Sequence, residues 1–402
     1  MTHRRDGDVQ RFTLEVPDSA LDDLQQRLAR TRWGQELDDP GWEDGTSPAW
    51  LRELVAWWRE GYDWRAQEAA INRFAHFHAR IDGIRIHFVH ERGCGPDPLP
   101  IVLTHGWPST FYELLPLVPL LTDPQRHGGD ASDAFDVVIP SLPGYGFSEP
   151  LAGRGSSRRI PDIWLGLMRD VLGYERFAAH GGDIGAMVTN RLGYESAEQL
   201  VGIHVALVAE PDVGSSAALL TEAERAMLAE RARGQETGGA YAHLQRTRPQ
   251  TLAYALNDSP VGLAAWILDK WWEWSDCAGD LERRFTKDQL LTTVLIYWLT
   301  QTIGPSFRIY RDWALGSASR PEAWEGREEV PTGIERPLPA DRRISVPTAV
   351  ALWEARYPRE WAERSYADLR QFTEMPRGGH FAAMEGPELL AADIRAFFRP
   401  LR

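Results

Sequence analysis

The sequence predicts an α/β fold built on a mostly parallel central sheet. Three features predict it: short, nearly unbroken apolar runs, helical stretches that separate these runs, and a long helical block before the last of them. Strands of a parallel sheet are covered on both faces by crossover helices, so they read as continuous apolar runs. The runs that fit this pattern are 101–104, 135–140, 177–180, 201–205 and 346–353.

The N-terminal region reads as helical from about residue 10 to 73. Leu21, Leu24 and Leu28 recur at helical spacing, and a second helix runs through the tryptophans near residue 57. Strand signals begin at Phe77. There the pair Asp82-Gly83 predicts a hairpin turn between two strands, at 77–81 and 84–89.

A helical block follows the sixth predicted strand. Residues from about 211 to 335 contain many Ala, Leu, Glu and Arg and no convincing strand. A helical insertion in such a sheet covers the carboxyl ends of the strands, where ligands bind, so this block is expected to be a cap. We therefore expect an N-terminal helical extension at 1–73, a first core part at 74–210, the cap at 211–340 and a second core part at 341–402.

Composition narrows the classes of partner. The 402-residue chain is 43% hydrophobic and 25% charged, with a formal net charge of −14. That charge disfavours nucleic acid and anionic membrane surfaces, and no uninterrupted apolar run of ~18 residues predicts membrane insertion. The first residues do not read as a signal peptide, and Cys94 and Cys277 provide no disulfide framework, so a cytoplasmic location is expected. The sequence is compatible with a homodimer.

The most informative segment runs from Phe177 to Ala186. It reads as an apolar strand, a turn lined by glycines and the start of a helix, which is typical of a nucleophile elbow. This predicts the α/β-hydrolase fold, with the helical cap inserted after strand 6 and Asp183 in the place of the nucleophile. A carboxylate can attack carbon directly and form an ester that water then hydrolyses. Two simpler interpretations are a dinucleotide-binding turn, which lacks the full G-x-G-x-x-G spacing, and a helix N-cap.

An ester on Asp183 requires a water activated by a histidine, which an acid holds in place. In this fold the chain order is nucleophile, acid, histidine. His380 follows the last strand signal in a glycine-rich loop and is the predicted base. Glu354, at the end of the preceding strand, is the predicted acid, with Glu210 and Asp212 as alternatives.

Two backbone N–H groups are predicted to form an oxyanion hole. The segment His105-Gly106-Trp107-Pro108 follows a strand at the point where this fold places one donor, and the residue after the nucleophile supplies the other. We expect these donors to be Trp107 and Ile184. No cofactor is needed for this chemistry, and no metal site is predicted, because no carboxylate or Cys at ligand spacing completes a set with His76, His78, His87 and His90.

Several motifs occur in a fixed order: Tyr62-Asp63-Trp64-Arg65, Thr104-His105-Gly106-Trp107-Pro108, Pro140-Ser141-Leu142-Pro143-Gly144-Tyr145-Gly146-Phe147-Ser148, Gly181-Gly182-Asp183, Leu256-Asn257-Asp258-Ser259-Pro260 and Met375-Pro376-Arg377-Gly378-Gly379-His380-Phe381. With them the chain resembles the microsomal-type epoxide hydrolases, α/β-hydrolases with an N-terminal extension and a helical cap. The resemblance covers nearly the whole length. It implies that Asp183 is the nucleophile, His380 the base and Glu354 its partner.

The resemblance also implies that two cap tyrosines donate hydrogen bonds to the epoxide oxygen. Tyr241 and Tyr310 match those positions. Ring opening generates an alkoxide, which a phenol with a pKa of ~10 can stabilise. Three departures from the family pattern stand out. Ile184 replaces the usual Trp after the nucleophile, Ser109 replaces a Gly, and the segment before Glu354 is shorter than the family's Phe-Pro-x-Glu.

The activity that the resemblance implies is conversion of an apolar epoxide and water into a vicinal diol through an ester on Asp183. Two other functions stay open. A haloalkane or haloacid dehalogenase shares the Asp elbow but requires halide-binding donors, which the Ile184 side chain cannot supply. A ligand-binding protein without activity could use the same scaffold, although the intact Asp, His and paired Tyr argue against it.

Overall fold

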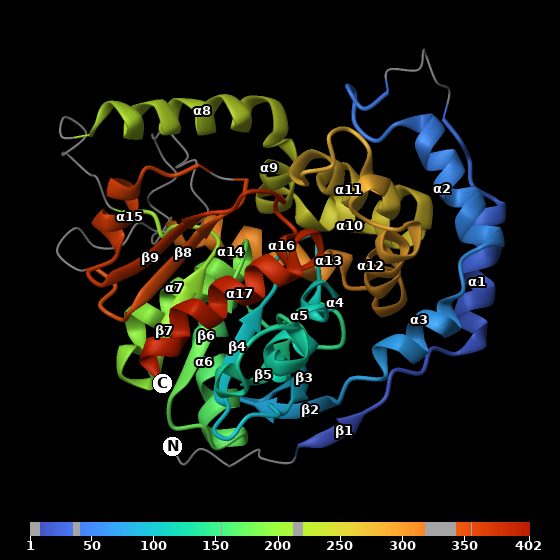
Figure 1. Ribbon diagram of the computed structural model, residues 1–402. Coiled ribbons are helices and arrows are strands. Elements are labelled where there is room, and N and C mark those ends of the chain that lie inside the picture. Colours follow the sequence, from blue (N-terminus) through green and yellow to red (C-terminus); the bar gives the residue numbers. More distant parts are fainter. Residues whose placement is uncertain (1–8, 35–40, 154, 212–219, 318–342, 355) are drawn as a thin grey trace.

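Within the described residues, nine strands form one sheet through the centre of the molecule (Figure 1). The computed structural model describes residues 9–34, 41–153, 155–211, 220–317, 343–354 and 356–402. The strand order is β1-β2-β3-β5-β4-β6-β7-β8-β9, antiparallel from β1 to β5 and parallel from there to β9. The strands are β1 (Gln10–Phe12), β2 (His76–Ile81), β3 (Ile84–Glu91), β4 (Leu99–Thr104), β5 (Phe135–Pro140), β6 (Phe177–Gly181), β7 (Leu200–Val205), β8 (Thr348–Leu352) and β9 (Leu369–Glu374).

The predicted hairpin and the predicted parallel strands are confirmed. β2 and β3 pair antiparallel, and Ile81 lies opposite Ile84 across the Asp82-Gly83 turn. Strand β1 is a correction, because the sequence was interpreted as helical from residue 10. Three residues are too few to show a period, and this strand exists only through its pairing with β2, where Phe12 lies opposite His76.

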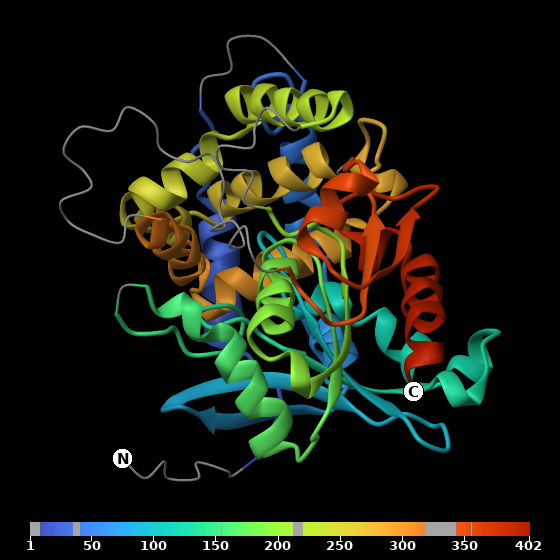
Figure 2. The same ribbon diagram turned by 90° about the vertical axis from the view of Figure 1, so that its left-hand side faces the viewer.

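Helices cover both faces of the sheet. Figure 2 shows α5 and α17 on one side and α6 and α7 on the other. Helix α17 packs through a stripe of buried residues that includes Leu390, Ile394 and Phe397. The helices that follow the core strands are α4 (Phe111–Leu114), α5 (Leu117–Thr122), α6 (Ile160–Gly166), α7 (Ile184–Glu195), α15 (Arg359–Ser365), α16 (Ala382–Glu385) and α17 (Pro387–Phe398).

The helical block lies above the carboxyl ends of the parallel strands (Figure 1). It follows β7, which is the sixth strand once β1 is set apart, and its described residues contain helices and no strand. This confirms the predicted α/β-hydrolase fold with an inserted helical cap. The boundary predicted at residue 340 lies outside the described residues. The cap helices are α8 (Glu222–Gly238), α9 (Ala240–Thr247), α10 (Pro249–Asp258), α11 (Pro260–Trp274), α12 (Lys287–Thr300), α13 (Ile303–Ser306) and α14 (Arg308–Ser317).

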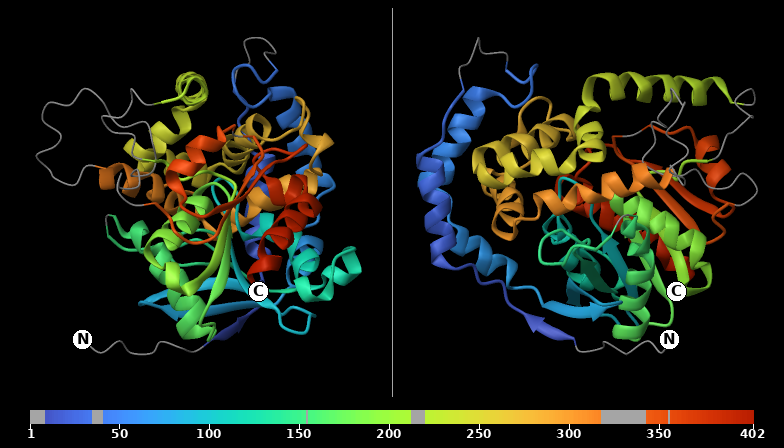
Figure 3. Two further views of the ribbon diagram at one scale, coloured as in Figure 1. Left: turned by 60° about the vertical axis from the view of Figure 1, so that its left-hand side comes forward. Right: turned by 180° about the vertical axis from the view of Figure 1, so that it is seen from behind.

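Three N-terminal helices run along the outer side of the cap, as the view from behind in Figure 3 shows. They are α1 (Asp18–Ala29), α2 (Pro48–Glu60) and α3 (Trp64–Ile71). Side-chain hydrogen bonds join the two layers: the Trp57 indole donates to Asp288 at 2.8 Å, and the hydroxyl groups of Tyr62 and Thr292 lie 3.0 Å apart. The extension therefore supports the cap from the side that faces away from the core. In the described part of the chain, no helix has the length and apolar character needed to cross a membrane.

Candidate active site

Asp183 lies at the tip of a tight turn between β6 and α7. Its backbone angles, φ 48° and ψ −126°, lie outside the usual regions for a residue with a side chain, so the turn is strained. The turn also needs small neighbours, because a Cβ at Gly185 would lie 1.9 Å from the carbonyl oxygen of Thr104. Although Asp183 occupies the N-cap position of α7, its side chain makes no capping hydrogen bond. The carboxylate therefore does not act as the cap of its own helix.

The two carboxylate oxygens of Asp183 have different neighbours. Oδ1 accepts a hydrogen bond from the backbone N–H of Trp107 at 2.8 Å, and the backbone N–H of Ile184 also donates to the carboxylate. Oδ2 lies 3.6 Å from Nε2 of His380. The two residues predicted as oxyanion donors and the predicted base therefore surround one side chain.

Charge and burial act on Asp183 in opposite directions. Burial raises the pKa of Asp183 above its ordinary value, whereas the positive charge of His380 and the two backbone N–H groups lower it. The net direction is upward. The same groups that hold the carboxylate in place therefore also favour its charged form.

His380 contacts an acid on its other side. Its Nδ1 lies 2.5 Å from Oε1 of Glu354, which follows β8 directly. Of the two alternative acids, Glu210 instead pairs with Arg231 at 3.1 Å, and Asp212 lies outside the described residues. The structure thus places Asp183, His380 and Glu354 in one continuous row.

The carboxylates on either side of His380 make its imidazole strongly basic. Burial alone would lower the pKa of His380, but the charge and hydrogen bond of Glu354 and the charge of Asp183 raise it to about 10. Glu113 adds a smaller contribution in the same direction. The imidazole is therefore protonated near neutral pH as long as Asp183 is charged.

Tyr241 and Tyr310 come from cap helices α9 and α14 and face the Trp107 ring. The Tyr241 ring stacks on Trp107 with centroids 5.2 Å apart and an interplanar angle of 7°, and the Tyr310 ring meets Trp107 edge-on at 6.0 Å. The two side chains also share a hydrogen bond. Burial, followed by nearby charge, raises the pKa of each phenol above its ordinary value. Both hydroxyl groups therefore keep their protons at neutral pH.

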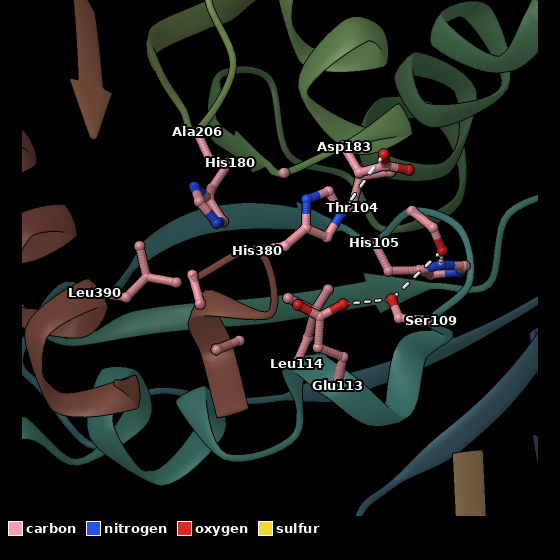
Figure 4. A pocket seen from close by; sticks show the side chains of 14 residues that line it. Thr104, His105, Ser109, Glu113, Leu114, His180, Asp183, Ala206, His380 and Leu390 are labelled. Atoms are coloured by element: carbon pink, nitrogen blue, oxygen red, sulfur yellow. Dashed lines mark hydrogen bonds and ion pairs between the residues drawn. The ribbon is translucent and has the colours of Figure 1, made fainter. Parts of the chain in front are cut away.

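A small cavity of about 20 Å³ lies between Asp183, His380 and the start of α4. Its space matches one water molecule. Figure 4 shows Glu113 and Ser109 on its wall, joined by a hydrogen bond from the Ser109 hydroxyl to the Glu113 carboxyl group. Burial raises the pKa of Glu113 to about 7, although Ser109 and His380 oppose this shift. Glu113 is not among the site residues predicted from the sequence; its spacing of four residues from Ser109, across the start of a helix, is the signal that could have indicated the pair.

The histidines of β2 and β3 bind polar neighbours and one another. His76 Nδ1 and His87 Nε2 lie 3.0 Å apart, and His87 Nδ1 lies 2.9 Å from the Ser141 hydroxyl group. In the described ranges, no group of three or more His, Cys, Asp or Glu side chains is arranged to hold a metal ion.

Comparison with known proteins gives consistent results. Residues 9–114 match the family model described as epoxide hydrolase N terminus. The chain is 43% identical to a Stigmatella aurantiaca protein named "Putative epoxide hydrolase", with 97% of this chain and 85% of that protein covered. It is 35% identical to epoxide hydrolase 1 of Sus scrofa, covering 98% and 89%. The structure of Aspergillus niger epoxide hydrolase superimposes with a TM-score of 0.80 at 29% identity, covering 99% of this chain and 97% of that one.

Replacing Glu354 with Gln is expected to lower the pKa of His380 by about one to three units, because the lost negative charge no longer stabilises the imidazolium. The measurement is an NMR titration of protein labelled in its histidines. The matched control is Glu374→Gln, which removes an exposed carboxylate that pairs with Arg356 at 3.3 Å. An equal His380 pKa in the Glu354 variant and the wild type would contradict the electrostatic account.

Proposed function

The chain belongs to the epoxide hydrolase family, and from this premise we propose that it hydrolyses an apolar epoxide to a vicinal diol through a covalent ester on Asp183. The observation that carries the proposal is that the two carboxylate oxygens of Asp183 have different neighbours. Oδ1 is held by the Trp107 N–H at 2.8 Å, and Oδ2 is directed toward His380 at 3.6 Å. One oxygen is thus fixed while the other stays available for attack on an epoxide carbon.

In the proposed first step, Oδ2 attacks a ring carbon and the carbon–oxygen bond of the epoxide breaks. Negative charge develops on the departing oxygen, and Tyr241 and Tyr310 supply hydrogen bonds to it, one of them giving up its proton. The raised pKa of both phenols supports this role, because a donor must be protonated before it can act. The hydrogen bond between the two side chains keeps them close enough to share one oxygen.

In the second step, water attacks the carbonyl carbon of the ester. His380 takes a proton from this water, and the oxyanion forms on Oδ1, which already accepts from Trp107, with the Ile184 N–H as the second proposed donor. Breakage of the acyl–oxygen bond releases the diol, which carries Oδ2 away; the second proton of the attacking water passes to this departing oxygen, and the water oxygen completes the carboxylate. His380 is left protonated, as in the free enzyme, because the proton that it lost after ester formation had already passed to the tyrosinate.

Esterification itself prepares His380 for this second step. In the free enzyme the charge of Asp183 contributes to raising the pKa of His380 to about 10. An ester is neutral, so this contribution disappears once the bond forms and the His380 pKa falls. The imidazolium therefore becomes a stronger acid and loses its proton when a base is needed.

The surroundings of the tyrosines support an apolar substrate. Trp107 and Trp274 pack against Tyr241, with the Trp274 and Tyr241 ring centroids 5.1 Å apart, and Phe307 meets Trp107 edge-on. Such aromatic faces favour hydrophobic groups beside the reacting ring.

Three further proposals concern the whole chain: a division into domains at residues 73, 210 and 340, a cytoplasmic location, and a homodimer. Gel filtration of the purified chain tests the homodimer.

Replacing His380 with Gln is expected to trap the ester. Ring opening uses Asp183 and the tyrosines and proceeds, whereas hydrolysis loses its base. After mixing with a styrene-type or aliphatic epoxide, intact mass spectrometry should detect the protein with one added substrate, and wild-type protein should release diol instead.

The control for this variant is His127→Gln, which changes an exposed histidine outside the site and should turn over like the wild type. Diol release at the wild-type rate by the His380 variant would contradict the proposed base. Absence of both adduct and diol across the epoxide panel would contradict the proposed function.

Replacing Tyr241 or Tyr310 with Phe is expected to slow ester formation by on the order of a hundredfold, and the double change should slow it further, because each removes a donor to the developing alkoxide. The rate is measured by intact mass in the His380→Gln background. Tyr254→Phe, at a side chain that is 71% exposed, is the matched control. Ester formation at an unchanged rate in the double variant would remove the tyrosines from the mechanism.

A further inference from the structure

A partly buried carboxylate, Glu385, binds the backbone on both sides of His380. Its Oε2 accepts the N–H of Gly379 at 2.9 Å, and its Oε1 accepts the N–H of Phe381 at 3.0 Å. These two residues flank His380 in the chain. A single side chain at the end of α16 thus fixes the loop that carries the imidazole.

The same carboxylate also binds the cap. Oε2 of Glu385 accepts a third hydrogen bond, 2.8 Å long, from the backbone N–H of Asp276, which lies just beyond α11. Two bonds reinforce this connection: the His380 N–H donates to the Trp274 carbonyl at 2.9 Å, and the Gly378 N–H donates to the Asp276 carboxylate at 3.1 Å. Cap segment 274–276 and the loop of His380 are therefore bonded to each other through Glu385.

The loop approaches the cap too closely for any side chain at residue 379. A Cβ on Gly379 would lie 2.5 Å from the Trp274 carbonyl oxygen and 2.7 Å from the Asp276 nitrogen. Asp276 is itself held by Arg284, whose Nη2 lies 2.5 Å from its carboxylate. The contact between loop and cap is therefore tightly packed and fixed from both sides.

We propose that Glu385 is a positioning residue for ester hydrolysis, holding the His380 loop against the cap so that the imidazole reaches water at the Asp183 ester. This inference rests on the proposed function. The carboxylate contacts neither substrate nor the reacting atoms in the proposed mechanism; it acts through the backbone of Gly379 and Phe381. The cap segment it holds also carries Trp274, whose ring lies 4.9 Å from His380 and 5.1 Å from Tyr241 between centroids. Glu385 thereby fixes the loop of the imidazole relative to this cap segment.

The two steps of the proposed mechanism depend on Glu385 to different degrees. Ester formation uses Asp183 and the cap tyrosines, whereas ester hydrolysis requires His380 to be aligned with a water molecule. Misplacement of a reacting group by about 1 Å costs on the order of a hundredfold in rate. Loss of the Glu385 clamp should therefore slow hydrolysis about tenfold to a hundredfold and change ester formation by less than about threefold.

The test compares Glu385→Gln with Glu388→Gln, which changes an exposed carboxylate three residues along. In Glu385→Gln one acceptor oxygen becomes an NH₂ group, which cannot accept the backbone N–H groups, while the side-chain shape is kept. Both rates are measured in single turnovers with excess enzyme by quenching and intact mass spectrometry. The expected result is that ester accumulates in Glu385→Gln and decays slowly, while Glu388→Gln behaves like the wild type.

A second variant, Gly379→Ala, tests the same contact without changing Glu385. Its added methyl group pushes the loop off segment 274–276, so it should also slow hydrolysis selectively. Wild-type hydrolysis in both variants, or an equal fall of both rates together with a lower melting temperature, would overturn the positioning role. Failure of the proposed function is distinguishable, because then His380→Gln forms no ester either.

Discussion

The rest of the site depends on one constraint: a strained turn directs the carboxylate of Asp183 onto the backbone N–H of Trp107. That bond, at 2.8 Å, links the end of β6 to the loop after β4. Neighbouring parallel strands end at the same edge of the sheet, so the two segments meet without any long connection. The strained turn can form only because small residues such as Gly185 let α7 begin against the end of β4.

Next to this fixed carboxylate lies the imidazole of His380, which the chain surrounds with further carboxyl groups. Glu354 contacts His380 directly, Asp183 lies on its other side, and Glu113 faces the same small cavity. Such an arrangement would leave His380 a poor base if nothing changed during turnover, since its pKa is raised to about 10. In the proposed mechanism the ester removes one of these charges, so the electrostatics of the site change between the two steps. The cap contributes two groups without charge, the phenols of Tyr241 and Tyr310, which lie among aromatic side chains.

Local signals in the sequence were sufficient for the features that depend on local chemistry. The elbow around Asp183 could be recognised because it requires glycines at fixed offsets, and the Asp82-Gly83 hairpin because few other pairs form such a turn. Chain order was enough to select His380, which the structure places beside Asp183. Glu354 is predicted from its place at the end of the strand before the last one, with Glu210 and Asp212 left as alternatives, and it is the acid that the structure brings to His380.

Features that arise only from long-range contacts could not be predicted from the sequence. Strand β1 is three residues long and is defined by its partner β2, so it has no period of its own. Glu113 could have been indicated only by its spacing from Ser109, because distant segments build the cavity that it faces. Glu385 carries no local signature of its role, because it joins the neighbouring His380 loop to Asp276, 109 residues earlier in the chain. The family resemblance, and not spacing, indicated Tyr241 and Tyr310, since an amphipathic helix places buried tyrosines in the same way.

The central claim is that Asp183 forms a bond to the substrate. A single turnover in heavy-oxygen water, with enzyme in excess over an epoxide, tests it most directly. The account predicts that the heavy oxygen appears in the peptide that contains Asp183 and that the diol from this first turnover is unlabelled. Heavy oxygen in the diol with none in Asp183 would mean that water attacks the epoxide directly, and would contradict the account.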